Sequence, residues 1–173
     1  MAFFLPLGIL DFEAVENAKS DLWRIRNISA GYPLTGIRSD VRKSAMVMFM
    51  SEVLFRTVRD GGGDKGLYDW CKGAILTLDA LESDFSNYHL RFLLEYAFQL
   101  GFAPSADALM PFAGPLLAKV SDLLNSSLED FLLYPLSGRE RSEIAEVILK
   151  YLSCHMEITI NVKSLSVLGE LFR

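Results

Sequence analysis

The sequence predicts a mainly α-helical protein, a helical bundle that carries a small β-hairpin at its N-terminus. Apolar residues alternate with polar ones in the first thirty residues and recur at helical spacing from about residue 39 onward. The apolar fraction of 51% and the charged fraction of 23% exclude a disordered chain. A length of 173 residues suits one compact domain, or one domain with a fragment of another.

The first thirty residues predict two strands joined by a short loop. Residues 10–15 alternate between apolar and polar side chains, and so do residues 22–28 after the polar turn at 16–21. An isolated hairpin is marginal in water, so these strands require other strands or a helical surface. The chain offers no further convincing strands.

Capping and stop signals divide the rest of the chain. Asp40 and Asp64 precede helices expected at about 41–59 and from 65, separated by the Gly61–Gly63 run, and a third helix ends at Gly101. Three prolines predict an irregular loop at 102–115. Short helices are expected near 116–125, 127–133 and 163–171. Capping-box spacing is present at Ser126–Glu129 and at Ser137–Glu140, where the longest late helix begins.

Apolar stripes predict which helix faces are buried. The expected inward residues are Val41, Ala45, Met48, Phe49, Val53 and Leu54 in the first helix; Leu67, Trp70, Cys71, Ala74, Ile75 and Leu78 in the second; Tyr88, Phe92, Leu93, Tyr96 and Leu100 in the third; and Ile144, Val147, Ile148, Tyr151 and Leu152 in the late helix. The run Met46–Met50 is expected in the core, although methionines also line grooves for partner peptides.

Enzymatic motifs and ligand spacings are missing from the sequence. The glycines at 61–66 lack the spacing of a phosphate loop, and His89 and His155 have no second ligand nearby. Cys71 and Cys154 form no redox or zinc motif. We therefore expect no enzyme, metal or cofactor. With no membrane-spanning run and no export signal, the expected location is the cytoplasm.

Five basic residues are the main candidates for ligand contact. Arg24 and Arg26 share one face of the second strand, and Arg38, Arg42 and Lys43 follow after a short connection. Together they could form one positive patch for phosphates. The alternative is a solvated face with ordinary charge scatter. The net charge of −5 argues against a protein that simply coats nucleic acid.

Several stretches, in order along nearly the whole chain, resemble the RecO family of bacterial recombination mediators, most closely its Bacteroides-type branch. The stretch from Ala30 to Leu54 resembles the start of the family's helical region. Residues 87–94, followed by Leu100-Gly-Phe-Ala-Pro104, resemble a helix that ends in a Leu-Gly-aromatic-x-Pro turn. His155 with residues 162–165 resembles the C-terminal signature, and residues 5–10 and 23–26 fit the last two strands of an N-terminal barrel.

The resemblance implies a partial OB-fold at residues 1–31 and an α-helical domain at 32–173. Only about two of the five strands of an OB barrel fit before Tyr32. The four-cysteine zinc site of some relatives is not carried over, because residues 102–125 contain no cysteine. Unpaired strand edges invite pairing, so a dimer through this β region, or a hairpin packed on the helices, is expected.

The resemblance also implies a function in DNA repair and recombination. Expected activities are binding of single- and double-stranded DNA, strand annealing, and work with RecR to load RecA onto DNA covered by single-strand-binding protein. The acidic, aromatic-ended tail of that protein is expected to dock on the helical domain, with Arg91 as a candidate contact. Two alternatives stay open: Arg91 as a surface arginine that covers apolar area, and the chain as a helical protein–protein interaction module without DNA binding.

Overall fold

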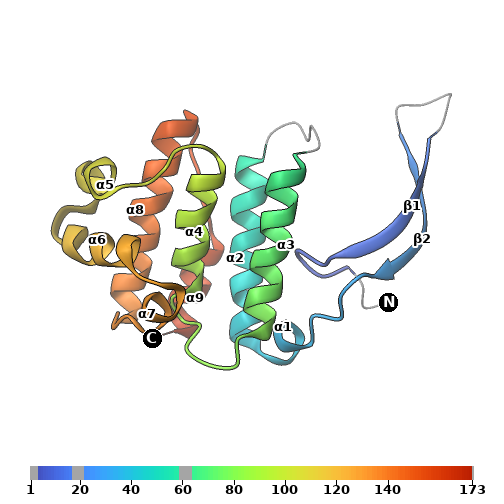
Figure 1. The fold of residues 1–173 in the computed structure, drawn as a ribbon, viewed down its shortest axis with the longest axis horizontal. Helices are drawn as coiled ribbons and strands as arrows, with labels where there is room; N and C mark the ends of the chain where they lie inside the picture. The colour runs from blue at the N-terminus through green and yellow to red at the C-terminus, as the bar shows by residue number, and fades with distance from the viewer. Residues whose placement is uncertain (1–3, 17–21, 59–63, 173) are drawn as a thin grey trace.

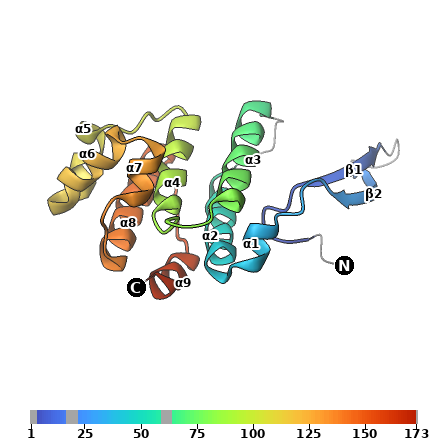
Figure 2. The ribbon, with the colours of Figure 1, turned by 60° about the horizontal axis from the view of Figure 1, so that its bottom comes forward.

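The computed structural model describes residues 4–16, 22–58 and 64–172, and it places a β-hairpin beside a bundle of helices (Figure 1). The hairpin projects from the side of the bundle at which the first helices lie, in both ribbon views (Figures 1 and 2). The predicted fold class is confirmed. Among the described residues, no helix is both long enough and apolar enough to cross a membrane.

The hairpin consists of two antiparallel strands, β1 (Leu10–Val15) and β2 (Arg24–Ala30). A β-bulge interrupts the register between Asp11 and Glu13, and it includes Asn27, whose φ of 52° is left-handed. The Asn27 amide donates a 2.8 Å hydrogen bond to Glu13 Oε2 across this bulge.

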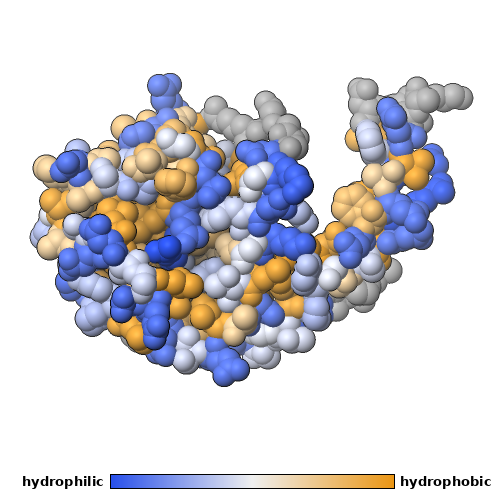
Figure 3. Space-filling model, in the orientation of Figure 1, coloured by the Kyte–Doolittle hydropathy of each residue, from blue (hydrophilic) through white to orange (hydrophobic). Residues whose placement is uncertain are grey.

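Every residue of β2 is exposed, so the alternating pattern buries no face. Apolar and polar side chains are interleaved on the surface of the projecting hairpin (Figure 3). Strand β1 is likewise exposed from Asp11 to Val15, so the expected packing of the hairpin on the helices is wrong for these two strands.

Two helices follow the hairpin in direct succession. Helix α1 (Thr35–Ser39), which the sequence did not predict, is followed by α2 (Val41–Thr57). The Asp40 side chain accepts from the Arg42 backbone N–H at 2.8 Å and caps α2 as expected. The predicted stop at Gly61–Gly63 lies outside the described residues.

The predicted core stripe of α2 is wrong at two positions. Val41 is 69% exposed and Met48 is 54% exposed. Because α2 packs against α1, α3, α4 and α9, its buried residues surround much of the helix instead of forming one stripe. The other four residues of the Met46–Met50 run are buried, as expected.

Two helices form the next part of the bundle. Helix α3 (Lys65–Ala80) begins at its predicted cap, where Asp64 accepts from the Leu67 N–H at 3.0 Å. Helix α4 (Tyr88–Gln99) ends just before Gly101, whose φ of 83° is the left-handed conformation typical of helix ends. The Trp70 ring of α3 stacks on Phe92 of α4, with ring centroids 5.2 Å apart.

The predicted loop at 102–115 is instead largely helical. Helix α5 (Ala106–Ala113) starts at Ser105, whose hydroxyl accepts from the Ala108 N–H at 3.2 Å, and it contains Pro111. The helix forms in spite of this proline because it packs against α6 and α8. A 3₁₀ turn (Gly114–Leu116) then leads into α6 (Leu117–Asn125).

The remaining helices correct one predicted cap and confirm another. Helix α7 (Leu128–Leu133) is capped by Ser127 rather than by Ser126, because the Ser126 hydroxyl donates to the Leu123 carbonyl at the end of α6. Helix α8 (Gly138–Met156) has the predicted capping box of Ser137 and Glu140, and its five predicted inward residues are buried. Helix α9 (Ser164–Leu171) packs against α2 and α8.

Candidate functional site

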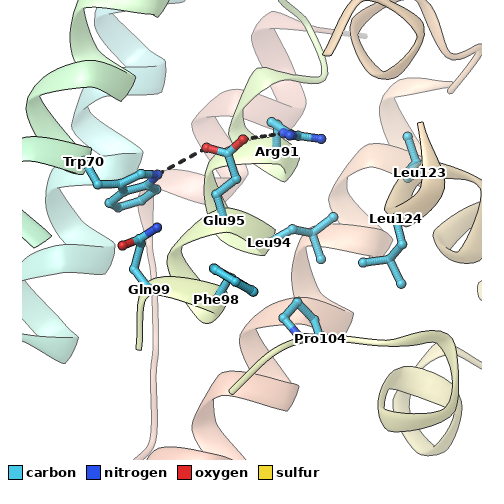
Figure 4. A pocket seen from close by; sticks show the side chains of 9 residues that line it. All are labelled: Trp70, Arg91, Leu94, Glu95, Phe98, Gln99, Pro104, Leu123 and Leu124. Carbon is cyan, nitrogen blue, oxygen red and sulfur yellow. Dashed lines mark hydrogen bonds and ion pairs between the residues drawn. The ribbon is translucent and has the colours of Figure 1, made fainter. Parts of the chain in front are cut away.

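A pocket of about 470 Å³ opens beside α4, and we call it the α4 groove. It is bounded by α3 on one side, by α6 on another, and by the segment that follows α4 (Figure 4). Its volume lies within the range of roughly 300–1,000 Å³ that is usual for ligand pockets. The lining residues are Trp70, Arg91, Leu94, Glu95, Phe98, Gln99, Pro104, Leu123 and Leu124.

Helical spacing places four of these side chains on one face of α4. Arg91, Leu94, Glu95 and Phe98 stand at positions i, i+3, i+4 and i+7, which share a face of an α-helix. The turn after α4 then brings Pro104 to the edge of the groove (Figure 4). The local sequence thus builds the groove from one helix face and the turn that ends it.

The floor of the groove is apolar and its mouth is aromatic. Leu94 is 6% exposed and Leu123 is fully buried, so both belong to the core beneath the groove. Phe98, by contrast, is 65% exposed. The exposed Phe98 ring therefore offers apolar surface that a ligand can contact without any rearrangement of the fold.

The polar side of the groove is formed by three side chains. Arg91 Nε donates a 2.5 Å hydrogen bond to Glu95 Oε1, and the indole N–H of Trp70 donates to Glu95 Oε2 at 3.2 Å (Figure 4). The Arg91 guanidinium also lies 5.6 Å from the centre of the Phe131 ring, a cation–π contact. One carboxylate therefore accepts from a cation and from an indole at the same place.

The same three side chains also line a second, smaller cavity of about 210 Å³ between α3 and α4. Its other lining residues are Gly73, Ala74, Thr77, Tyr88 and Leu128. Because Trp70, Arg91 and Glu95 belong to both cavities, they stand at the boundary between them.

The five predicted basic residues do not form one patch in the structure. Arg24 and Arg26 are exposed on β2, where Arg26 lies opposite Glu13 in the register. At about 3.3 Å per strand residue, Arg24 lies roughly 20 Å along the hairpin from Ala30, away from the helices. Arg38 is exposed near the end of α1, at the base of the hairpin.

Arg42 and Lys43 are both engaged within the helical bundle. Arg42 forms an ion pair of 2.9 Å with Asp40 and lies over the Phe85 ring. Lys43 is only 4% exposed, and its ammonium donates to the Asp79 carbonyl oxygen at 2.9 Å. The buried Lys43 ammonium cannot also reach a phosphate without leaving its place in the fold, whereas the Arg42 side chain stays 51% exposed.

Two buried titratable side chains, Cys71 and His89, have shifted pKa values. Burial raises the pKa of the Cys71 thiol to about 11, so the thiol stays protonated. Burial, together with the positive charge of Arg141, lowers the pKa of His89 to about 3. Within residues 4–16, 22–58 and 64–172, no group of three or more His, Cys, Asp or Glu side chains could hold a metal ion.

Sequence reasoning singled out Arg91, which lines the groove, and named none of the other lining residues as contacts. Trp70 was assigned to the core stripe of α3, and Leu123 and Leu124 were seen only as part of a short helix. The sequence did contain a signal for the groove, because Leu94 and Phe98 follow Arg91 at i+3 and i+7 and so share its face of the helix. It was missed because apolar residues at helical spacing predict a core more often than a binding surface.

The comparisons with known proteins agree on one family. The family described as "Recombination protein O C terminal" matches residues 38–110. The chain is 30% identical to the "DNA repair protein RecO" of Flavobacterium johnsoniae, over 99% of this chain and 79% of that protein. It is 28% identical to the protein of the same name in Phocaeicola vulgatus, over 98% of this chain and 79% of that relative. No solved structure gives a significant match.

Proposed function

This chain belongs to the RecO family of DNA repair proteins, and from that premise we propose that it is a recombination mediator that docks the acidic, aromatic-ended tail of single-strand-binding protein in the α4 groove. The observation that carries the proposal is the pairing of an apolar, partly exposed surface with the Arg91 guanidinium in one pocket. The role is one of binding, so no bond-making residue is assigned.

The chemistry of the groove suits such a tail. An aromatic end group would contact Phe98, Pro104 and Leu124, where apolar surface is already gathered. The acidic residues of the tail would approach Arg91, whose guanidinium can bind a carboxylate with two hydrogen bonds. Arg91 is 28% exposed along its side chain, which leaves it accessible to a ligand.

The hairpin is the proposed contact with single- and double-stranded DNA. Arg24 and Arg26 would contact phosphates, and the exposed rings of Trp23 and Phe12 offer surfaces on which bases of a single strand could stack. Arg38 and Arg42 would extend the contact toward the helices. Lys43 is left out, because it is buried.

Action with RecR, in loading RecA onto DNA covered by single-strand-binding protein, completes the proposal. Its support is membership of the family alone.

Fluorescence anisotropy tests the proposal with two labelled ligands, an acidic peptide that ends in phenylalanine and an oligo-dT. We expect the peptide to bind the unaltered chain and to lose roughly tenfold in affinity with Arg91→Ala, since removing one partner of a partly desolvated charge pair leaves the other charge unpaired. Arg139→Ala is the matched control, because Arg139 pairs with Glu143 at the same spacing on α8 and is 86% exposed. Equal losses in both variants would overturn the assignment of the groove.

The oligo-dT arm separates this proposal from the alternative, a helical protein–protein interaction module without DNA binding. The observation that favours the alternative is that Lys43, one of the five basic candidates, is buried and donates to a backbone carbonyl oxygen. Contact through the hairpin predicts that affinity falls with salt, with a log–log slope of roughly −0.7 for each phosphate neutralised. Peptide binding without any oligo-dT binding would favour the alternative.

A further inference from the structure

We propose that Glu95 is a built-in competitor of the acidic ligand in the α4 groove. Its carboxylate occupies the place beside the Arg91 guanidinium and the Trp70 indole that a carboxylate of the ligand would take. The inference rests on the proposed function, because it concerns the regulation of that same groove.

The geometry gives Glu95 the donors that an incoming carboxylate would use. Each of its two oxygens accepts a different group, Oε1 from Arg91 Nε at 2.5 Å and Oε2 from Trp70 Nε1 at 3.2 Å. In Figure 4 the carboxylate stands between these two side chains at the polar side of the groove. A ligand carboxylate that approaches Arg91 therefore meets a negative charge already in place.

Two further observations show that the interaction is replaceable. The side chain of Glu95 is 37% exposed, so it can turn toward water when a ligand takes its place. It is also joined to Arg91 at i and i+4 on one helix, and both side chains keep partial exposure, 28% for Arg91 and 37% for Glu95, so solvent weakens their attraction. The competitor is thus weak enough to be displaced.

The consequence is that Glu95 lowers the affinity of the groove for acidic ligands and makes their binding reversible. Removing its charge should strengthen binding of an acidic peptide by roughly twofold to fivefold, the range expected for one like-charge contact near a surface. The gain should vanish for a peptide whose acidic residues are replaced by amides, because such a peptide has no negative side chains for the Glu95 carboxylate to repel.

The test compares Glu95→Gln with the unaltered chain, using the acidic phenylalanine-ended peptide and its amide counterpart. Glutamine keeps an acceptor for the Trp70 indole and removes the charge, so packing is preserved. Glu143→Gln is the matched control, since it removes the same charge from the pair with Arg139 on α8. The double variant Arg91→Ala/Glu95→Gln shows whether the gain depends on Arg91.

We expect Glu95→Gln to tighten binding of the acidic peptide alone, Glu143→Gln to leave it unchanged, and the gain to shrink without Arg91. If the unaltered chain binds the peptide through Arg91 but Glu95→Gln brings no gain in affinity, competition by Glu95 is wrong and the proposed function stands. An equal gain from Glu143→Gln would show a general effect of net charge and would also overturn the inference. If neither the unaltered chain nor Glu95→Gln binds, the proposed function itself fails.

Discussion

The Lys43 ammonium donates a 2.9 Å hydrogen bond to the backbone carbonyl oxygen of Asp79, and this contact joins α2 to the end of α3. The side chain of Asp79 lies at the same junction, where its carboxylate accepts a 2.7 Å hydrogen bond from the Ile37 N–H of α1. A lysine that the sequence offers for phosphate contact is thus part of the core of the bundle.

Gly36 should be intolerant of any side chain, because α1 passes so close to α3 at this junction. A Cβ at Gly36 would lie 2.0 Å from the Asp79 carbonyl oxygen, a backbone atom that cannot move aside alone. Gly36→Ala is expected to lower the free energy of unfolding by about 2 kcal/mol or more in urea denaturation. Gly73→Ala, where nothing lies within 4 Å, should be neutral or stabilising, and equal losses at both glycines would contradict this packing.

Glu52 on α2 should stabilise the start of α9. Its carboxylate accepts from the backbone N–H groups of Lys163 and Ser164 at 3.1 and 2.9 Å, and from the Ser164 hydroxyl at 2.7 Å. Burial alone would raise the pKa of Glu52, but these hydrogen bonds outweigh burial, and its pKa is lowered. The stabilisation is therefore present above the ordinary pKa of a glutamate and is lost as the pH falls below it.

Glu52→Ala is expected to cost about 1–2 kcal/mol of unfolding free energy at pH 7, the usual loss of a helix cap. Glu146→Ala is the control, since Glu146 forms only an exposed pair of 3.8 Å with Lys150. An unchanged urea midpoint in Glu52→Ala would contradict the capping role.

His89 should make the fold sensitive to mild acid. Burial and the nearby Arg141 lower its pKa from the ordinary 6.5 to about 3, so the native protein keeps the ring neutral. The unfolded chain binds a proton first as the pH falls, and stability is therefore lost between pH 6.5 and about 3. At pH 5 the loss relative to neutral pH should reach about 2 kcal/mol.

Urea denaturation at several pH values measures this dependence. His89→Gln should be less stable at pH 7, since it alters a packed site, but its stability should fall less between pH 7 and pH 5. The account of His89 would be wrong if His89→Gln showed the same slope as the unaltered protein.

The exposed hairpin should pair with a second copy of the chain. Strand β1 carries the acidic Asp11 and Glu13, whereas β2 carries Arg24 and Arg26, so β1 of one copy is complementary in charge to β2 of another. We expect self-association that rises with concentration in light scattering and weakens with Ile25→Lys. Val41→Lys is the control, on an apolar side chain of α2 that is 69% exposed, against 54% for Ile25. A chain that stays monomeric at every concentration would contradict the pairing.

Local signals in the sequence predicted much of the fold. Asp40, Asp64 and Ser137 each cap a helix because a side-chain oxygen next to an apolar stripe satisfies the first N–H groups wherever the helix then packs. The stripe of α8 was correct because one face of that helix meets the core. Helix caps and apolar stripes depend on residues that are neighbours along the chain, so they can be recognised from the sequence alone.

The failures depend on neighbours in space. Pro111 reads as a loop residue, yet α5 forms because Leu109 and Ala113 are buried in the bundle. Lys43 reads as a surface cation until Asp79 is placed beside it. The α4 groove was missed for the same reason, since its walls come from three helices that only the fold brings together.

Trp70 offers the most direct measurement of the central claim, that the acidic peptide binds in the α4 groove. The chain has two tryptophans, so Trp23→Phe leaves Trp70, which lines the groove, as the sole tryptophan. We predict that its fluorescence changes on titration with the peptide and saturates at the same concentration as the anisotropy. Peptide binding by anisotropy with no change in Trp70 emission would place the ligand elsewhere and contradict the account.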